Sequence, residues 1–207
     1  IWIFKKQEYP FPFLHKHKRE RGLFIMRYDS YTRLINGKHP LPEGYVPKQL
    51  TDIGLPFQAS SQDSRRLLEI RTAQAALRLF QSAQRDGLNL YGISGYRSYQ
   101  CQKQLYGQNP YVAAPGTSEH QSGLALDVSC AEAGFALTEE FAFTSEGSWL
   151  SRNASLFGFI IRYPKGKENI TGFPWEPWHI RYVTRALSNY LALTGQTLEE
   201  YYALRPF

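Results

Sequence analysis

Cysteine is scarce in this chain: of 207 residues only Cys101 and Cys130 are cysteines, and they do not form a CxxC pair. A zinc site built from thiolates is therefore disfavoured, because such sites use closely spaced cysteine pairs. The even number permits one disulfide if the protein is exported. Two reduced cysteines that pack as small apolar side chains remain the other interpretation.

Long apolar runs are also absent, since no segment approaches the ~18 consecutive apolar residues of a membrane-spanning helix. The apolar start Ile1–Phe4, followed by Lys5 and Lys6, is too short to cross a bilayer. Because the sequence begins at Ile1 instead of Met, we expect this start to be the edge of a hydrophobic anchor that precedes it. The 207 residues themselves are expected to form a water-soluble protein.

Acidic residues are fewer than basic ones, 18 against 24, which gives a net charge of +6 and a pI near 9.3. Such a surface suits nucleic acid or an anionic cell envelope. No zinc-finger, RNA-recognition or helix-turn-helix motif accompanies the charge, so nucleic acid is disfavoured as a partner. Basic residues gather only at 15–21, within a stretch over residues 1–30 that we interpret as a basic arm or linker. That arm is either an anchor for anionic envelope polymers or a disordered tether, and residues 31–207 form the folded domain.

The apolar pattern predicts a mixture of helices and strands. Apolar stripes and capping residues predict helices over 61–86, 98–106, 148–157 and 184–193, and alternation predicts strands over 88–94, 124–129, 159–163 and 178–183. Thr197 and Glu200 have the spacing of a capping box for a last helical turn. Strands and helices do not alternate strictly, which is typical of an α+β fold with a small, mostly antiparallel sheet flanked by helices.

Two of the five histidines stand in short motifs that also hold a carboxylate. His120 precedes Asp127 by seven residues, with Gly123 between them to bend the backbone. On the strand over 124–129, Asp127 shares its face with small residues, so a metal ion could approach its carboxylate closely. A lone histidine is more often structural, and the combination with Asp127 is what favours a metal site.

The second histidine, His179, follows Glu176 by three residues. Positions three apart face opposite sides of a straight strand, and Pro177 predicts a turn that relaxes this constraint. One side chain can then bind metal while the other accepts a proton from a metal-bound water. Three protein ligands, an open coordination position and a base are what metal-assisted hydrolysis requires.

These motifs resemble those of a known family. Ser118–Asp127, SEHQSGLALD, resembles the SxHxxGxAxD motif of the VanY-type zinc D-alanyl-D-alanine carboxypeptidases. Glu176–Tyr182, EPWHIRY, is similar to the EPWH element of that family, and Ser94–Tyr99, SGYRSY, is similar to its SGYRS segment. The resemblance extends over about residues 31–202. It implies the small α+β fold that these peptidases share with hedgehog signalling domains.

The resemblance also implies a cofactor, Zn²⁺, and a role for each site residue. The implied zinc ligands are His120, Asp127 and His179. Glu176 is implied as general base and later proton donor, and Arg97 as the group that polarises the scissile carbonyl or stabilises the oxyanion. Ser118 is implied to touch the substrate, and Gln102 to contact the terminal carboxylate of the peptide.

The implied activity is removal of the terminal D-alanine from peptidoglycan stem peptides or their precursors, outside the cytoplasm in the cell envelope. The segment Gly107–Thr117, which links the helix predicted over 98–106 to the motif that begins at Ser118, is short, and this favours cleavage of D-Ala-D-Ala. One alternative is an L,D-carboxypeptidase that acts on tetrapeptide stems. The other is a non-catalytic, zinc-containing module that binds peptidoglycan, which would be expected to lack Glu176 or Arg97, whereas both are present.

Overall fold

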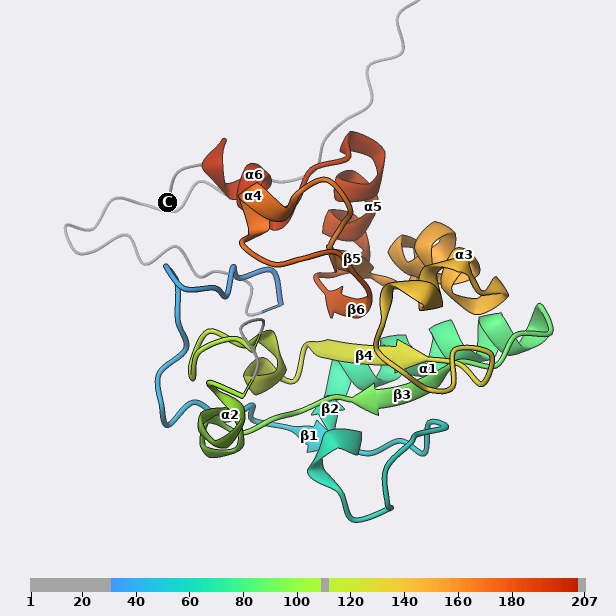
Figure 1. Cartoon of the computed structure of the whole chain (residues 1–207), viewed down its shortest axis with the longest axis horizontal. Coiled ribbons are helices and arrows are strands. Elements are labelled where there is room, and N and C mark those ends of the chain that lie inside the picture. The colour runs from blue at the N-terminus through green and yellow to red at the C-terminus, as the bar shows by residue number, and fades with distance from the viewer. Residues whose placement is uncertain (1–30, 109–111, 205–207) are drawn as a thin grey trace, which may run out of the picture.

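A four-stranded antiparallel sheet forms the centre of the fold (Figure 1), in a computed structural model that describes residues 31–108 and 112–204. Its strands are β3 (Tyr91–Ser94), β4 (Ala125–Ser129), β5 (Phe159–Tyr163) and β6 (Glu176–Tyr182), in the spatial order β3-β4-β6-β5. Two short strands, β1 (Leu50–Thr51) and β2 (Leu68–Glu69), pair separately. The predicted α+β class with a small antiparallel sheet is confirmed.

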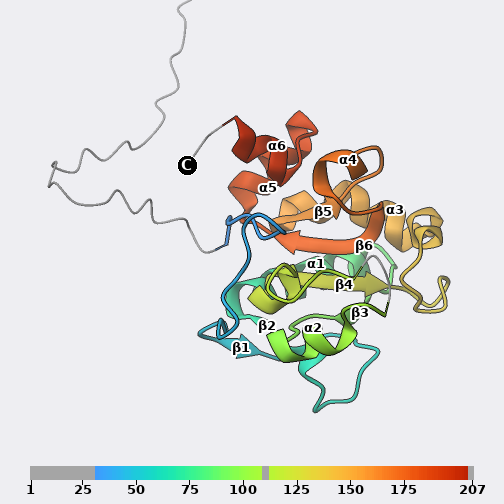
Figure 2. The same cartoon turned by 60° about the vertical axis from the view of Figure 1, so that its left-hand side comes forward.

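Helices surround this sheet, with α1 behind it and α2 in front of it in the view of Figure 2. The α-helices are α1 (Ile70–Arg85), α2 (Tyr99–Leu105), α3 (Ser145–Asn153), α4 (Glu168–Thr171), α5 (Arg185–Thr194) and α6 (Leu198–Ala203). The 3-10 turns are η1 (Ser64–Arg66), η2 (Glu119–Ser122), η3 (Glu139–Phe143) and η4 (Ala154–Phe157). The predicted capping box is confirmed at the start of α6, where Thr197 and Glu200 cap each other's backbone.

The helix predicted over 61–86 begins only at Ile70, so its first third was wrong. Asp63 caps the 3-10 turn η1 and not α1. The cap of α1 is Glu69, whose carboxylate accepts hydrogen bonds from two backbone N–H groups of the first helical turn at 2.9 and 3.2 Å. The carboxylate also suits the positive end of the helix dipole.

Residues 61–69 have a tertiary role that local propensity does not reveal. The backbone N–H groups of Gly95 and Tyr96 donate to the carbonyls of Arg65 and Leu67 at 2.6 and 2.7 Å. This approach requires glycine, because a Cβ at position 95 would lie 2.5 Å from the Leu67 carbonyl oxygen. These two hydrogen bonds therefore fix the loop that follows β3, which carries Arg97, against the segment that contains η1.

Two other predicted boundaries were also displaced. The predicted strand over 88–94 begins at Tyr91. The helix predicted over 148–157 begins at Ser145, since the Thr144 hydroxyl accepts from the Gly147 N–H at 3.0 Å. Its last turn is the 3-10 turn η4, which ends at Gly158 with a φ of 94°.

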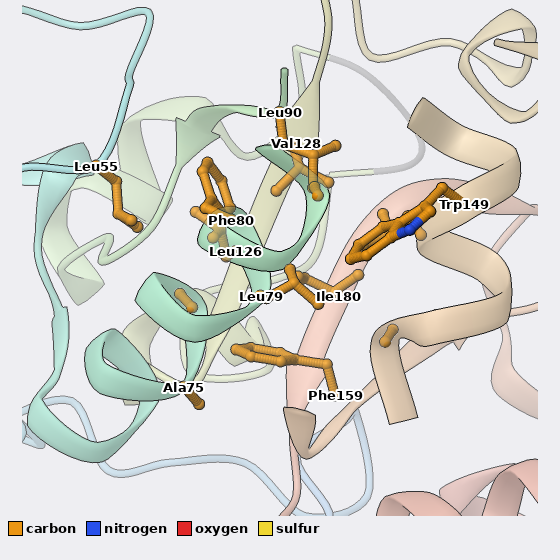
Figure 3. Packing of buried hydrophobic residues seen from close by; sticks show 14 of the residues in the cluster. Leu55, Ala75, Leu79, Phe80, Leu90, Leu126, Val128, Trp149, Phe159 and Ile180 are labelled. Carbon is orange, nitrogen blue, oxygen red and sulfur yellow. The ribbon is translucent and has the colours of Figure 1, made fainter. Parts of the chain in front are cut away.

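The main core fills one face of the sheet (Figure 3), where α1 and α3 pack. Leu79 of α1, Leu126 and Val128 of β4 and Ile180 of β6 are fully buried there. The predicted alternation along 124–129 is thus confirmed, since the residues between these core positions point to the opposite face. That opposite face carries the polar residues of the site.

The closing helices form a second apolar cluster with the first described residues. Leu187 and Leu191 of α5 and Leu198 of α6 pack with Leu34 and Val183. Within the described ranges, no helix has the length and apolar character needed to cross a bilayer. The predicted basic arm over residues 1–30 lies outside the described residues.

Candidate active site

Asp127 and His179 are direct neighbours across the β4–β6 pair. The preceding pair in this register, Leu126 opposite Ile180, points into the core, so Asp127 and His179 emerge together on the other face of the sheet. The distance between Asp127 Oδ1 and His179 Nδ1 is 2.8 Å. Sheet register therefore brings together two residues that are 52 positions apart in the sequence.

His120 reaches the same point from the turn η2. Its Nε2 lies 3.2 Å from Asp127 Oδ2, and its Nδ1 lies 2.7 Å from the carbonyl oxygen of Gly95. When Nδ1–H donates to that carbonyl, the Nε2 lone pair faces Asp127 and is available to a metal. Gly123 ends the turn with a φ of 68°, and a Cβ there would lie 2.9 Å from the Glu69 backbone nitrogen.

The three side chains fit a catalytic zinc centre. One donor atom from each of His120, Asp127 and His179 lies within 4.8 Å of the others, and all three residues are buried. Two imidazole nitrogens and one carboxylate oxygen are a three-ligand set that leaves zinc one coordination position open.

The ionisation of these groups depends on their burial and on one another. Burial opposes ionisation of Asp127, but His120 and His179 outweigh it and hold the pKa of its carboxyl well below the ordinary range. Burial lowers the pKa of His120, which favours the neutral ring that binds metal. Burial also opposes protonation of His179, yet Asp127 and Glu119 raise its pKa to about 10. A metal ion must therefore displace a proton from His179 when it binds.

Glu176 lies beside the ligands because β6 is irregular at Pro177–His179. Ile161 pairs with Ile180 and Tyr163 pairs with Glu176, so two steps along β5 match four along β6. This bulge lets Glu176 and His179 face the same side, as the predicted bend required, although the strand begins at Glu176 and not at Trp178.

The Glu176 carboxylate has the properties of a general base. Glu176 Oε2 is 4.0 Å from His179 Nδ1. Burial raises the pKa of Glu176 to about 7, and the charges of Asp127 and Glu119 reinforce this shift against the opposing effect of His179. A carboxyl group with this pKa can accept and return a proton near neutral pH.

Arg97 faces the same cavity and is held by two side chains. Its two terminal nitrogens donate to Ser94 Oγ at 3.1 Å and to Gln102 Oε1 at 3.0 Å. The amide nitrogen of Gln102 in turn donates to the carbonyl of Ala113 at 2.6 Å. The guanidinium is thus pre-oriented before any substrate arrives.

The structure brings all seven predicted site residues to one cavity of about 370 Å³. The other lining residues are Glu119 and a set of aromatic and apolar residues: Val112, Ala113, Leu137, Tyr163, Phe173, Pro174 and Trp178. The Tyr163 ring packs 5.1 Å from the His179 ring and 4.6 Å from that of Phe173, between centroids. Polar groups that converge in an apolar cleft are typical of a small-ligand site.

Sequence reasoning missed a buried charge cluster beneath the ligands. Glu119 forms ion pairs of 2.7 Å with both Arg162 and Arg181, and none of the three side chains is exposed. Burial opposes ionisation of Glu119, but the two arginines outweigh it and hold its pKa well below the ordinary range. The available signal was a charged residue inside each of two apolar strands, Arg162 and Arg181, which demands a buried partner.

The two cysteines are unpaired in the structure. Cys101 is exposed on α2, whereas Cys130 is buried in the main core. Both are therefore free thiols, and the predicted packing as a small apolar side chain is confirmed for Cys130 and wrong for Cys101.

The family model described as VanY, D-alanyl-D-alanine carboxypeptidase, matches residues 65–185. The Bacillus subtilis protein YodJ is 38% identical over 188 residues, which cover 86% of this chain and 69% of YodJ. The structure of the LdcB LD-carboxypeptidase is similar with a TM-score of 0.78 and 40% identity, over 82% of this chain and 84% of LdcB.

The vancomycin resistance D,D-pentapeptidase VanY from a VanB-type cassette, solved in complex with Zn(II), has a TM-score of 0.68 and 31% identity. That likeness covers 84% of this chain and 99% of the VanY chain. The predicted hedgehog/DD-peptidase-like fold is confirmed by these structures. The chain belongs to the VanY family of zinc-dependent D-alanyl-D-alanine carboxypeptidases.

Proposed function

We propose that residues 31–207 form a zinc carboxypeptidase domain that removes the terminal D-alanine from peptidoglycan stem peptides or their precursors. The observation that carries this proposal is the convergence of the three ligands with Glu176 and Arg97 in one cavity. A metal site alone would fit a binding module. A base and a fixed guanidinium beside it are the additional groups that peptide hydrolysis needs.

Glu176 and Arg97 have separate roles in the proposed reaction, and the position of each in the cavity supports its role. Bound Zn²⁺ lowers the pKa of a water ligand towards 7 and polarises a carbonyl oxygen. The Glu176 carboxylate accepts the proton of the attacking water and later gives it to the amine of the departing D-alanine. The Arg97 guanidinium donates hydrogen bonds to the oxygen on which negative charge develops. Removal of one such donor typically slows turnover by about 10²–10³-fold.

Two residues are proposed to contact the substrate directly. Ser118 lines the cavity, next to the turn that carries His120. Gln102 orients Arg97 in the free protein, because its amide oxygen accepts from the guanidinium. The Gln102 amide nitrogen carries two hydrogens, so while one is donated to the Ala113 carbonyl the other is available to the terminal carboxylate of the peptide.

We favour D-Ala-D-Ala as the bond that is cleaved, in line with the family as a whole. L,D-cleavage of a tetrapeptide stem is the second candidate, and the likeness to LdcB supports it. The short link Gly107–Thr117 supports D,D-cleavage, although part of that link lies outside the described residues. Release of D-alanine from matched pentapeptide and tetrapeptide stems distinguishes the two, and a preference for the tetrapeptide would reverse our assignment.

The activity is tested by D-alanine release from a pentapeptide by the zinc-loaded protein, with chelator and the variant Glu176→Ala. Both should abolish release, while Glu132→Ala, which alters an exposed glutamate, should leave it intact. Full activity of Glu176→Ala would contradict the proposed mechanism. Binding of peptidoglycan without product from any stem peptide would favour a non-catalytic module.

The VanY family acts on the cell wall, and we propose that the basic arm over residues 1–30 holds this chain there by binding anionic envelope polymers or lipids. Its charge carries the proposal, since clustered basic residues attract anionic surfaces in a salt-dependent way. Deletion of the arm should weaken association with cell-wall preparations at low salt and leave turnover of soluble peptide unchanged. Equal association of both forms would leave the arm as a tether.

A further inference from the structure

Three buried charges next to the metal ligands have no role in the proposed chemistry. The side chains of Glu119, Arg162 and Arg181 have no solvent exposure, and Glu119 Oε1 accepts from both Arg162 Nε and Arg181 Nη1 at 2.7 Å. Burying such groups is costly unless every one is paired. A protein that needed only packing here could fill the space with apolar side chains, so the arrangement invites a functional explanation.

The two oxygens of Glu119 face different partners. Oε1 is taken by the two arginines, and Oε2 faces Nε2 of His179 at 3.4 Å. The other ring nitrogen of His179, Nδ1, faces Asp127 at 2.8 Å and Glu176 at 4.0 Å. His179 must therefore present Nδ1 to a metal, and a neutral ring can do so only when its proton is on Nε2, next to Glu119.

We propose that Glu119 is a positioning residue of the metal centre: it accepts the Nε2–H of His179, and Arg162 and Arg181 fix it in that orientation. The proposal rests on the zinc site of the function proposed above, and not on the reaction catalysed there. A carboxylate that accepts the outer N–H of a ligating histidine fixes the ring orientation and tautomer, and its loss typically weakens metal binding by about 10–100-fold.

The cluster extends outward to both ends of the described chain. Arg162 donates to both oxygens of Glu199 on α6 at 2.9 and 2.6 Å. Arg181 donates to the backbone carbonyls of Tyr31 and Arg33 at 3.3 and 2.9 Å. Helix α6 and residues 31–33 therefore fix the two arginines, and the arginines in turn fix Glu119. Neither of these segments supplies a predicted metal ligand or catalytic group.

The variant Glu119→Gln separates positioning from packing because it keeps the shape of the side chain. Its single amide oxygen is needed by the two arginine donors, so its NH₂ group turns towards Nε2 of His179. Two donors cannot face each other, and His179 then shifts to the tautomer with the proton on Nδ1, where the metal should bind. We expect the zinc dissociation constant to rise about 10–100-fold, measured at pH 8 by competition with a chromophoric chelator.

The matched control is Glu199→Gln. It removes one negative charge from the same cluster, but Glu199 contacts Arg162 and not His179. Its zinc dissociation constant should stay within about threefold of that of the unmodified protein. Equal weakening by both variants would assign the effect to cluster charge and overturn the proposal, as would unchanged zinc affinity in Glu119→Gln with lowered thermal stability of the metal-free protein.

A second measurement needs no variant and so does not depend on whether Glu119→Gln folds. In the zinc-loaded protein with ¹⁵N-labelled histidine, NMR should show His179 with a slowly exchanging Nε2–H and with Nδ1 bound to metal. A spectrum with Nε2 bound to metal would overturn the proposal. Zinc binding without D-alanine release would contradict the proposed function and leave this inference standing, so the two can fail separately.

Discussion

The substitution Glu176→Gln should stabilise the metal-free protein above neutral pH while it removes the general base. Glu176 is a buried carboxyl group, with 14% of its side chain exposed, and burial raises its pKa from the ordinary 4.5 to about 7. Its charged form is therefore disfavoured in the folded state relative to the unfolded chain. Glutamine has nearly the same shape and carries no charge.

The sign and size of the effect follow from proton linkage. Between pH 4.5 and about 7 the folded state retains the Glu176 proton that the unfolded chain has lost, so the free energy of unfolding falls as pH rises. At about 1.4 kcal/mol per pKa unit, the full cost reaches about 3 kcal/mol above pH 7. Glu176→Gln should thus match the unmodified protein near pH 4 and exceed its stability by up to about 3 kcal/mol at pH 8.

Urea unfolding in the presence of EDTA, from pH 4.5 to 8.5, measures this difference. The exposed substitution Glu132→Gln is the control and should show no such pH dependence. Zinc should shrink the gain, because a divalent cation beside Glu176 favours its charged form. A difference that does not change with pH, or a variant less stable at pH 8, would refute the reasoning.

Three further outcomes are expected. Arg97→Lys should lower kcat about 10²-fold. Gln102→Ala should lower kcat by less, because it removes only one of the two side-chain contacts that hold the Arg97 guanidinium. A kcat equal to that of the unmodified protein in both variants would contradict the oxyanion role of Arg97. A thiol reagent should modify Cys101 in the native protein and Cys130 only on unfolding, and two fast-reacting thiols would contradict the burial described. Gly123→Ala should lower the free energy of unfolding by about 1–3 kcal/mol, measured by denaturant titration. Position 123 has a φ of 68°, and a Cβ there would lie 2.9 Å from the Glu69 backbone nitrogen. An unchanged unfolding midpoint would contradict this prediction.

The candidate site could be proposed from the sequence because its residues lie in short motifs that resemble those of a known family, and strand alternation adds the orientation of Asp127. Alternation along 124–129 was enough to place Asp127 on the face opposite Leu126, and the structure has both there. The bend expected from Pro177 is present as a bulge in β6. Period-two patterning depends on the pleat of the strand, which tertiary contacts alter little.

The start of α1 could not be predicted, because two signals conflict at residues 61–69. Local propensity supports a helix there, and Asp63 is a good cap. The segment instead forms only the 3-10 turn η1, and its carbonyls at Arg65 and Leu67 accept from the N–H groups of Gly95 and Tyr96, about 30 positions later in the chain. Such pairing is visible only when the loop that carries Arg97 has been placed.

The charge cluster was hidden for a related reason. Arg162 and Arg181 could each be recognised as misplaced charges within apolar strands, but their shared partner Glu119 lies 43 and 62 positions away. Which of the chain's 18 acidic residues meets them depends on the order of the strands, and a single sequence does not give that order. The residues that line the cavity could therefore be proposed from the sequence, whereas the buried charges that lie beneath the metal ligands could not.

The geometry of the metal site follows from the packing on the other face of the sheet. Leu126 and Ile180 are fully buried against α1, and they fix the register that sets Asp127 opposite His179. A slip of one residue would turn the Asp127 carboxylate into the apolar core, and an unpaired charge there costs several kcal/mol. The core therefore disfavours the alternative register even without the metal. It follows that the ligands are held in place before zinc arrives, so binding energy is not spent on assembling the sheet.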